Sequence, residues 1–118
     1  MKTNPREILL YYNPESSLDK KTLAFAKSVT PHVKTYNFTK NPSTNTSWHM
    51  ILKSLKMEPK DLLDKSHPDY QQQIRGKEFN SVGWLDILQN NPHLIKAPIA
   101  IKGDKAILCL SPTDIYSL

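Results

Sequence analysis

The fold is decided by residues 7–26, which read EILLYYNPESSLDKKTLAFA. The run Ile8–Tyr12 is short, apolar and rich in aromatic and branched residues, which favours a buried strand. Asn13 and Pro14 end this strand, because proline cannot donate to a sheet ladder and asparagine tolerates turns. The stretch therefore predicts a strand, a tight loop and a helix, and the N-terminus of a helix after such a loop is a natural anion or substrate site.

The helix in this stretch is expected to begin at a serine. Ser16 or Ser17 can cap it, and Asp19 is favourable in its first turn because a carboxylate complements the helix dipole. An apolar face recurs at helical spacing. Its members are Leu18, Thr22, Leu23, Phe25 and Ala26.

Length and composition indicate one globular domain. The chain has 118 residues, enough for a real core, with 38% apolar and 23% charged residues. No apolar run approaches the roughly 20 residues that span a bilayer, so we expect no membrane segment. The N-terminus lacks the layout of a signal peptide, since Pro5 and Arg6 lead straight into the first strand. We therefore expect a cytoplasmic protein.

The basic charge is scattered along the chain. The formal net charge is +5, but only Arg6 and Arg75 are arginines. Arginine supplies the planar fork that reads phosphates and base edges, so specific nucleic-acid binding is not expected. Weak, nonspecific binding stays open.

Cys109 is the single cysteine, which excludes a disulfide within the chain, a C-x-x-C redox pair and a zinc site of several thiolates. It lies in an apolar run, where a thiol behaves as a small hydrophobe, so core packing is favoured over a redox role. The histidines are His32, His49, His67 and His93. They lack metal-ligand spacing, so no metal site is expected.

The rest of the chain alternates strands and helices. Residues 32–38 alternate apolar and polar side chains, as in a half-exposed strand. Residues 98–101 and 106–110 predict two further strands joined by a hairpin at Gly103, and Ser111 caps a closing helix over 113–118. The first two strands, joined by a helix, suggest a parallel pair. We therefore predict an α/β fold with a four-stranded mixed sheet and helices on both faces.

The central helices are expected to form an insertion over about 43–95. Trp48 and Leu52 mark one amphipathic helix. Ser81 is expected to cap another, in which Val82, Leu85 and Leu88 share a face. We expect Trp48, Leu52 and Trp84 to be core residues of the insertion.

This order of elements resembles the arsenate reductase (ArsC) and Spx family over about residues 6–118. The matching pieces are Asn13-Pro14, Thr22-Leu23, Trp48, Leu52, Leu62-Leu63, Pro68, Tyr70 and residues 91–99, NPHLIKAPI. The resemblance implies a single domain over residues 1–118 with a thioredoxin-like fold and a helical insertion. It also implies a cis peptide bond before Pro98, facing the first loop, and we favour cis over a plain strand start.

The departures from the family pattern decide the expected function. The resemblance places the nucleophilic cysteine at Ser16, the second cysteine of Spx-type members at Asp19 and an arginine at Lys20. Three more family arginines correspond to Asp64, Ala97 and Leu110. Nearly every group that would hold or attack an oxyanion is therefore replaced.

Ser16 has three interpretations. A serine hydroxyl is a weak nucleophile without a base beside it, and no histidine has motif spacing, so a helix cap is favoured. A narrower alternative is that Ser16 donates a hydrogen bond to the thiolate of a bound thiol such as glutathione. Catalytic residues are thus not assigned beyond a degenerate pair, Ser16 and Lys20.

We expect any ligand at the loop to meet Asn13, Glu15, Ser16, Ser17, Lys20, Ala97 and Pro98. Glu15 would repel an anion unless it points to water, whereas Lys20 and the serines could hold one weakly. The leading hypothesis is a catalytically inactive ArsC/Spx-like protein that binds a protein partner or a small thiol or anion ligand, without a cofactor. The alternative is an oxidoreductase or transferase that borrows the thiol of glutathione or glutaredoxin.

Overall fold

The computed structural model describes residues 5–41 and 43–118. Its contacts divide the chain into two compact units. The sheet unit comprises Met1–Asn41 and Ala97–Leu118, and the helical unit comprises Pro42–Lys96.

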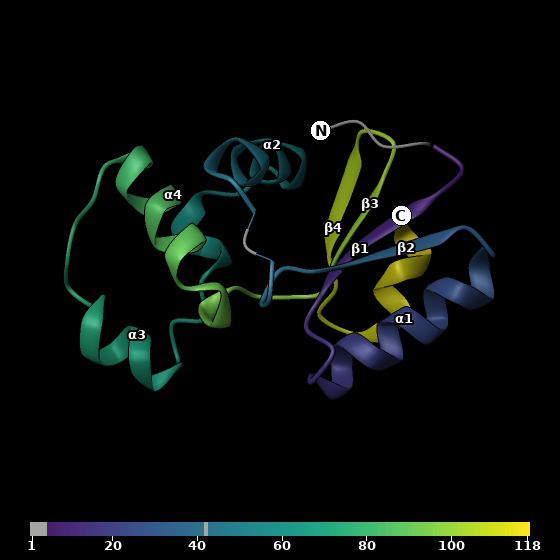
Figure 1. The fold of residues 1–118 in the computed structure, drawn as a ribbon, viewed down its shortest axis with the longest axis horizontal. Helices are drawn as coiled ribbons and strands as arrows, with labels where there is room; N and C mark the ends of the chain where they lie inside the picture. Colours follow the sequence, from purple (N-terminus) through teal and green to yellow (C-terminus); the bar gives the residue numbers. More distant parts are fainter. Residues whose placement is uncertain (1–4, 42) are drawn as a thin grey trace. The chain divides into compact units, whose positions relative to one another are not determined.

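The sheet unit contains a four-stranded mixed sheet (Figure 1). Its strands are β1 (Ile8–Tyr12), β2 (Val33–Asn37), β3 (Ile99–Lys102) and β4 (Lys105–Leu108). The strand order is β2-β1-β3-β4. β1 pairs parallel with β2, and β3 pairs antiparallel with both β1 and β4. The predicted parallel pair and hairpin are therefore confirmed, and Gly103 takes the expected positive φ of 63° in the hairpin turn.

One face of the sheet packs against α1 (Ser17–Val29) and the C-terminal 3-10 turn η3 (Pro112–Ser117), which lie side by side in Figure 1. The core of this layer comprises Ile8, Leu10, Ala26, Ala100, Cys109 and Ile115, each at most 1% exposed. A fully buried aliphatic side chain contributes about 1.5–3 kcal/mol. The alternate residues Tyr11, Ile99 and Ile101 are buried as well, so both faces of the central strands are covered.

Ser111 caps η3 through a capping box with Asp114. The Asp114 Oδ2 atom accepts hydrogen bonds from the backbone N–H groups of Leu110 (2.8 Å) and Ser111 (3.0 Å). These bonds lower the pKa of Asp114, since they favour the ionised carboxylate. The cap was predicted, but the closing helix is a 3-10 turn.

The helical unit contains α2 (Asn45–Leu55), η1 (Pro59–Leu62), α3 (Pro68–Gln73), α4 (Ser81–Asn90) and η2 (Pro92–Leu94). Its core includes Trp48, Ile51, Leu52, Leu62, Leu63, Leu88 and Leu94. The Asp64 N–H donates to Leu94 O (2.7 Å), and the Lys96 N–H donates to Leu62 O (2.8 Å). These two bonds flank a bridge between Leu63 and Ile95, which ties the start of the unit to its end.

Two predictions for α4 are wrong. Asn80, not Ser81, is the N-cap, because its Oδ1 atom accepts the Gly83 N–H at 2.8 Å. Val82 is 63% exposed, although it was placed on one face with Leu85 and Leu88. At 3.6 residues per turn, Val82 lies about 120° around the helix from the buried Leu88, which is too far to share its contacts. Trp84 is only partly buried, unlike the core residues Trp48 and Leu52.

Candidate functional site

Ser16 is the N-cap of α1. Its Oγ atom accepts the Asp19 N–H at 3.3 Å, and its backbone carbonyl accepts the Lys20 N–H at 3.0 Å. The backbone at Ser16 is extended, with φ −82° and ψ 128°, as capping residues require. The predicted capping role is therefore confirmed, and it engages one lone pair of the Ser16 hydroxyl.

Asn13 shapes the loop that leads to this cap. Its Oδ1 atom accepts the Glu15 N–H at 3.0 Å, and its backbone carbonyl accepts the Ser16 N–H at 3.0 Å. Such an Asx turn reverses the chain within a few residues. Glu15, Ser17 and Lys20 are exposed around it, so Glu15 meets the condition under which it would not repel an anion.

Asp19 is the site residue whose position the sequence did not reveal. It is only 2% exposed, and its Oδ2 atom accepts the Asn13 N–H at 2.7 Å. Burial raises the pKa of the Asp19 carboxyl, because it penalises the ionised form, and hydrogen bonds from Asn13 and Ser16 offset part of that effect. The carboxyl therefore holds the end of β1 against the first turn of α1, beyond its expected role at the helix dipole.

The buried face of α1 contains different residues from the predicted apolar face. Asp19, Thr22 and Ala26 are its buried residues, whereas Leu18 and Phe25 are only partly buried. The Thr22 hydroxyl donates to Leu18 O at 2.8 Å, which satisfies it within the helix. The spacing of Asp19 from Thr22 and Ala26 is the signal that could have placed the carboxyl inside.

The peptide bond between Ala97 and Pro98 is cis, as expected from the resemblance. β3 pairs antiparallel with β1 in a register that sets Ile99 opposite Tyr11, so Ala97 and Pro98 continue along the end of β1 towards Asn13. Pro98 is buried, and its carbonyl accepts the Cys109 N–H at 2.9 Å. The sheet thus brings Ala97 and Pro98 to the same end of the strands as the loop.

Cys109 is fully buried in the core of the sheet unit. Burial raises the pKa of its thiol to about 11, and the negative charges of Asp114 and Asp19 act in the same direction. A thiolate is the reactive form of cysteine, so this environment suppresses its nucleophilicity at neutral pH. Core packing, the favoured interpretation of Cys109, agrees with this position.

The loop between β1 and α1 can do little nucleophilic chemistry with its own side chains. Ser16 hydrogen-bonds Asp19, and among the described residues no histidine hydrogen-bonds the Ser16 hydroxyl. Activation of a serine needs a base that is held to remove its proton, and here Ser16 contacts a carboxyl with a raised pKa that also accepts the Asn13 N–H. The ammonium of Lys20 is exposed to solvent, which screens its attraction for an anion.

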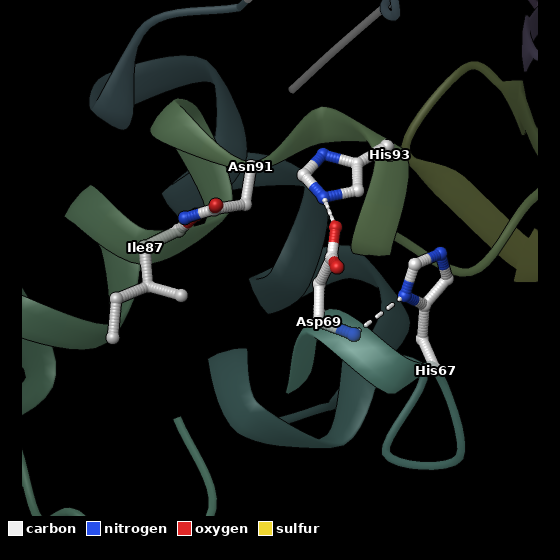
Figure 2. A network of polar contacts seen from close by, with 5 residues as sticks. All are labelled: His67, Asp69, Ile87, Asn91 and His93. Atoms are coloured by element: carbon white, nitrogen blue, oxygen red, sulfur yellow. Dashed lines mark hydrogen bonds and ion pairs between the residues drawn. The ribbon is translucent and has the colours of Figure 1, made fainter. Parts of the chain in front are cut away.

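A second polar cluster lies in the helical unit and was not foreseen (Figure 2). The His93 Nε2 atom lies 2.9 Å from Asp69 Oδ2, and His67 caps α3 because its Nδ1 atom accepts the Asp69 N–H at 3.1 Å. The two imidazole rings meet edge to face with centroids 5.5 Å apart. Even so, within residues 5–41 and 43–118 no three histidine, cysteine, aspartate or glutamate side chains form a group that could hold a metal ion.

The architecture of the sheet unit, with the cis-proline strand beside the loop and α1, defines a thioredoxin-like α/β fold, and the helical unit follows β2 in the chain. Similar solved structures come from the arsenate reductases. An arsenate reductase from Vibrio cholerae has a TM-score of 0.89 and 16% identity, covering 97% of this chain and 98% of that one. A proposed arsenate reductase from Yersinia pestis also has a TM-score of 0.89, with 19% identity over 95% of this chain and 100% of that one.

A proposed ArsC-family-related protein from Bacteroides fragilis is also similar, with a TM-score of 0.78 and 12% identity over 94% of this chain and 97% of that one. The predicted fold class is therefore confirmed: the chain has the fold of ArsC-type structures. No family model and no curated protein matches the sequence. In the part of the chain that the structure describes, every helix is too short or too polar to span a bilayer.

Proposed function

We propose that this chain is a catalytically silent member of the arsenate reductase (ArsC) family that uses the scaffold for binding. The single observation that carries the proposal is the corner of β1 and α1. The position that the resemblance gives to the nucleophilic cysteine is Ser16, and its hydroxyl caps α1 by accepting the Asp19 N–H. This hydrogen bond accounts for the serine at this position as a helix cap.

Asp19 supports the same proposal. In Spx-type proteins the resemblance places a second cysteine at this position, and here a buried carboxyl accepts the Asn13 N–H at 2.7 Å. A carboxyl can neither form a disulfide nor resolve one. The thiol that the chain does have, Cys109, is buried and has a pKa of about 11.

The cation at the loop is a poor match for an oxyanion substrate. Lys20 is exposed in the first turn of α1, at the position that the resemblance aligns with a family arginine. A lysine lacks the bidentate fork that matches an oxyanion. We therefore propose that the protein acts by binding a protein partner or a small ligand, in the manner of a Spx-like protein, and without turnover.

The decisive experiment is an arsenate reduction assay with purified protein, glutathione and glutaredoxin. We expect no turnover above the protein-free background from the wild type or from Ser16→Ala. Sustained reduction that Ser16→Ala abolishes, or a covalent mixed adduct at Ser16, would end this proposal. Ser16→Cys is the informative partner variant, because it restores sulfur at the corner and shows whether the remaining residues can support the reaction.

The alternative, an enzyme that borrows the thiol of glutathione, has a separate test. Reduced glutathione is titrated to millimolar concentration while amide resonances are followed by NMR. Unshifted amides of Ser16 and Ala97 at millimolar glutathione would exclude this alternative. Saturable shifts at both residues would instead favour the glutathione-linked oxidoreductase or transferase.

A further inference from the structure

The helical unit carries a surface groove made of two adjoining depressions. The larger has a volume of about 410 Å³ and is walled by Phe79, Trp84 and Pro59. The smaller, about 260 Å³, is walled by apolar side chains of α2 and α4, chiefly Leu52 and Leu85. Both depressions share Glu58, Pro59 and Ser81, so they form one elongated groove, here named the α2–α4 groove.

The aromatic end of the groove presents two ordered rings to a ligand. Phe79 and Trp84 meet edge to face with ring centroids 5.0 Å apart, and this contact holds both rings in place. Phe79 is 39% exposed, and Trp84 is only partly buried. Pre-ordered aromatic side chains of this kind dominate the binding energy of many protein interfaces, because they bury a large area at low entropic cost.

The charges along the groove favour an acidic occupant. Lys53 and Lys60 are exposed and line the two depressions, and the imidazole of His49 lies in the smaller one. Glu58 is the opposing carboxylate among the lining residues. The N-terminus of α4, capped by Asn80, opens into the larger depression and adds the positive end of a helix dipole.

We infer that the α2–α4 groove binds a peptide segment of a protein partner in which two apolar side chains are flanked by aspartate or glutamate. One apolar side chain would enter the Phe79–Trp84 depression and the other the Leu52–Leu85 depression, while the acidic residues face Lys53 and Lys60. Two adjoining depressions suit a linear peptide, because neighbouring side chains can enter each of them. This inference rests on the proposed function as a binding protein and names its partner class.

The test is selection of a random linear peptide library displayed on phage against the purified full chain. We expect enriched peptides that combine aromatic or leucine residues with aspartate or glutamate. Synthetic copies of those peptides should shift the NMR resonances of the Trp84 indole N–H and the Ser81 amide. Their affinity should fall as salt is added, because the lysine contacts are exposed to solvent.

Matched variants locate the binding. Lys53→Glu combined with Lys60→Glu should weaken the selected peptides by about tenfold, since both favourable contacts become repulsive. Lys77→Glu changes another exposed lysine of the same unit that does not line the groove, and it should leave affinity unchanged. Trp84→Ala should abolish binding, whereas Met50→Ala, which truncates an exposed side chain that does not line the groove, should not. The lysine variants keep the apolar packing intact, so they remain informative if Trp84→Ala unfolds.

Three results would overturn the inference. The first is that no peptide is enriched beyond the background of the doubly substituted lysine variant. The second is enrichment of basic peptides in place of acidic ones. The third is concentration-dependent self-association that Trp84→Ala removes, which would assign the groove to a second copy of the chain. None of these changes the outcome of the arsenate assay, so the groove and the proposed loss of catalysis fail separately.

Discussion

Asp19 shows how one buried carboxyl can hold a loop against the first turn of a helix. A cysteine at this position would be a small hydrophobe with a reactive sulfur, whereas the aspartate links the backbone of Asn13 to the first turn of α1. Removing a buried acceptor leaves its donor without a partner at a cost of about 1–3 kcal/mol. The loop between β1 and α1 is therefore stabilised by a carboxyl oxygen of Asp19.

The first prediction concerns the pH dependence of this carboxyl. The folded-state pKa of Asp19 is raised, so the folded protein retains a proton that the unfolded chain releases. The stability that this protonated group contributes is present at low pH and is lost as pH rises through the folded-state pKa. Asp19→Asn cannot ionise and keeps an oxygen for the Asn13 N–H. The unfolding free energy of Asp19→Asn relative to wild type should therefore increase with pH, as measured by urea denaturation from about pH 3 to pH 7.

Asp114→Asn is the matched control, because the pKa of Asp114 is lowered by backbone N–H donors. Its ionised form is stabilised in the folded state, so its contribution is present at neutral pH and is lost as pH falls through the folded-state pKa. The two aspartate variants should thus show opposite trends relative to wild type. Parallel trends would contradict the environments described for the two carboxyls.

The second prediction concerns Cys109. Because its thiol is fully buried and has a pKa of about 11, iodoacetamide should alkylate the native protein slowly at pH 8 and the urea-unfolded protein rapidly. Mass spectrometry of quenched samples measures both rates. Equal rates in the two states would mean that the thiol is accessible and would reopen a redox role.

At the scale of the element, α1 depends on its cap. The third prediction is that Ser16→Ala lowers the free energy of unfolding by about 1 kcal/mol, since the Asp19 N–H loses its acceptor. Ser17→Ala changes an exposed serine one residue later and should cost much less. Thermal or urea unfolding of the two variants makes the comparison, and a larger loss for Ser17→Ala would show that the cap is misassigned.

Elements that are determined by neighbouring residues could be predicted from the sequence. The strand Ile8–Tyr12, the cap at Ser16 and the turn at Gly103 each depend on side chains within a few residues, and the structure confirms them. The cis bond at Pro98 came from the family resemblance, because the residues around it do not determine the isomer.

Features that depend on tertiary contacts could not be predicted in the same way. Asp19 is buried where the Asn13 N–H across the loop supplies a partner, whereas the sequence analysis considered only its favourable place in the first turn of α1. The exposure of Val82 follows from how α4 packs against α2 and η1. Likewise, His67 and His93 lie far apart in sequence, and only the folding of the helical unit brings their rings to 5.5 Å.

At the scale of the whole molecule, the fold is shared with proteins of low sequence identity. Structures at 16–19% identity have a TM-score of 0.89, so few identical residues are needed to form the same fold. The proposed function therefore rests on the loop residues of this chain and not on the shared fold.

The fourth prediction concerns the net charge of +5. Scattered lysines attract phosphates without reading bases, so any binding to duplex DNA should be weak, equal for unrelated sequences and lost as salt rises to about 0.2 M. Fluorescence anisotropy with two unrelated duplexes measures it. A preference for one duplex that survives added salt would contradict the charge argument.

The outer strands of the sheet, β2 and β4, have one further consequence. Each carries a lysine with an exposed side chain, Lys34 on β2 and Lys105 on β4. A strand from another molecule that added to either edge would bring its side chains beside an ammonium group, which discourages such pairing. The two edge lysines therefore disfavour aggregation by strand addition, more so at β4, because Lys34 pairs with Glu7 at 3.4 Å.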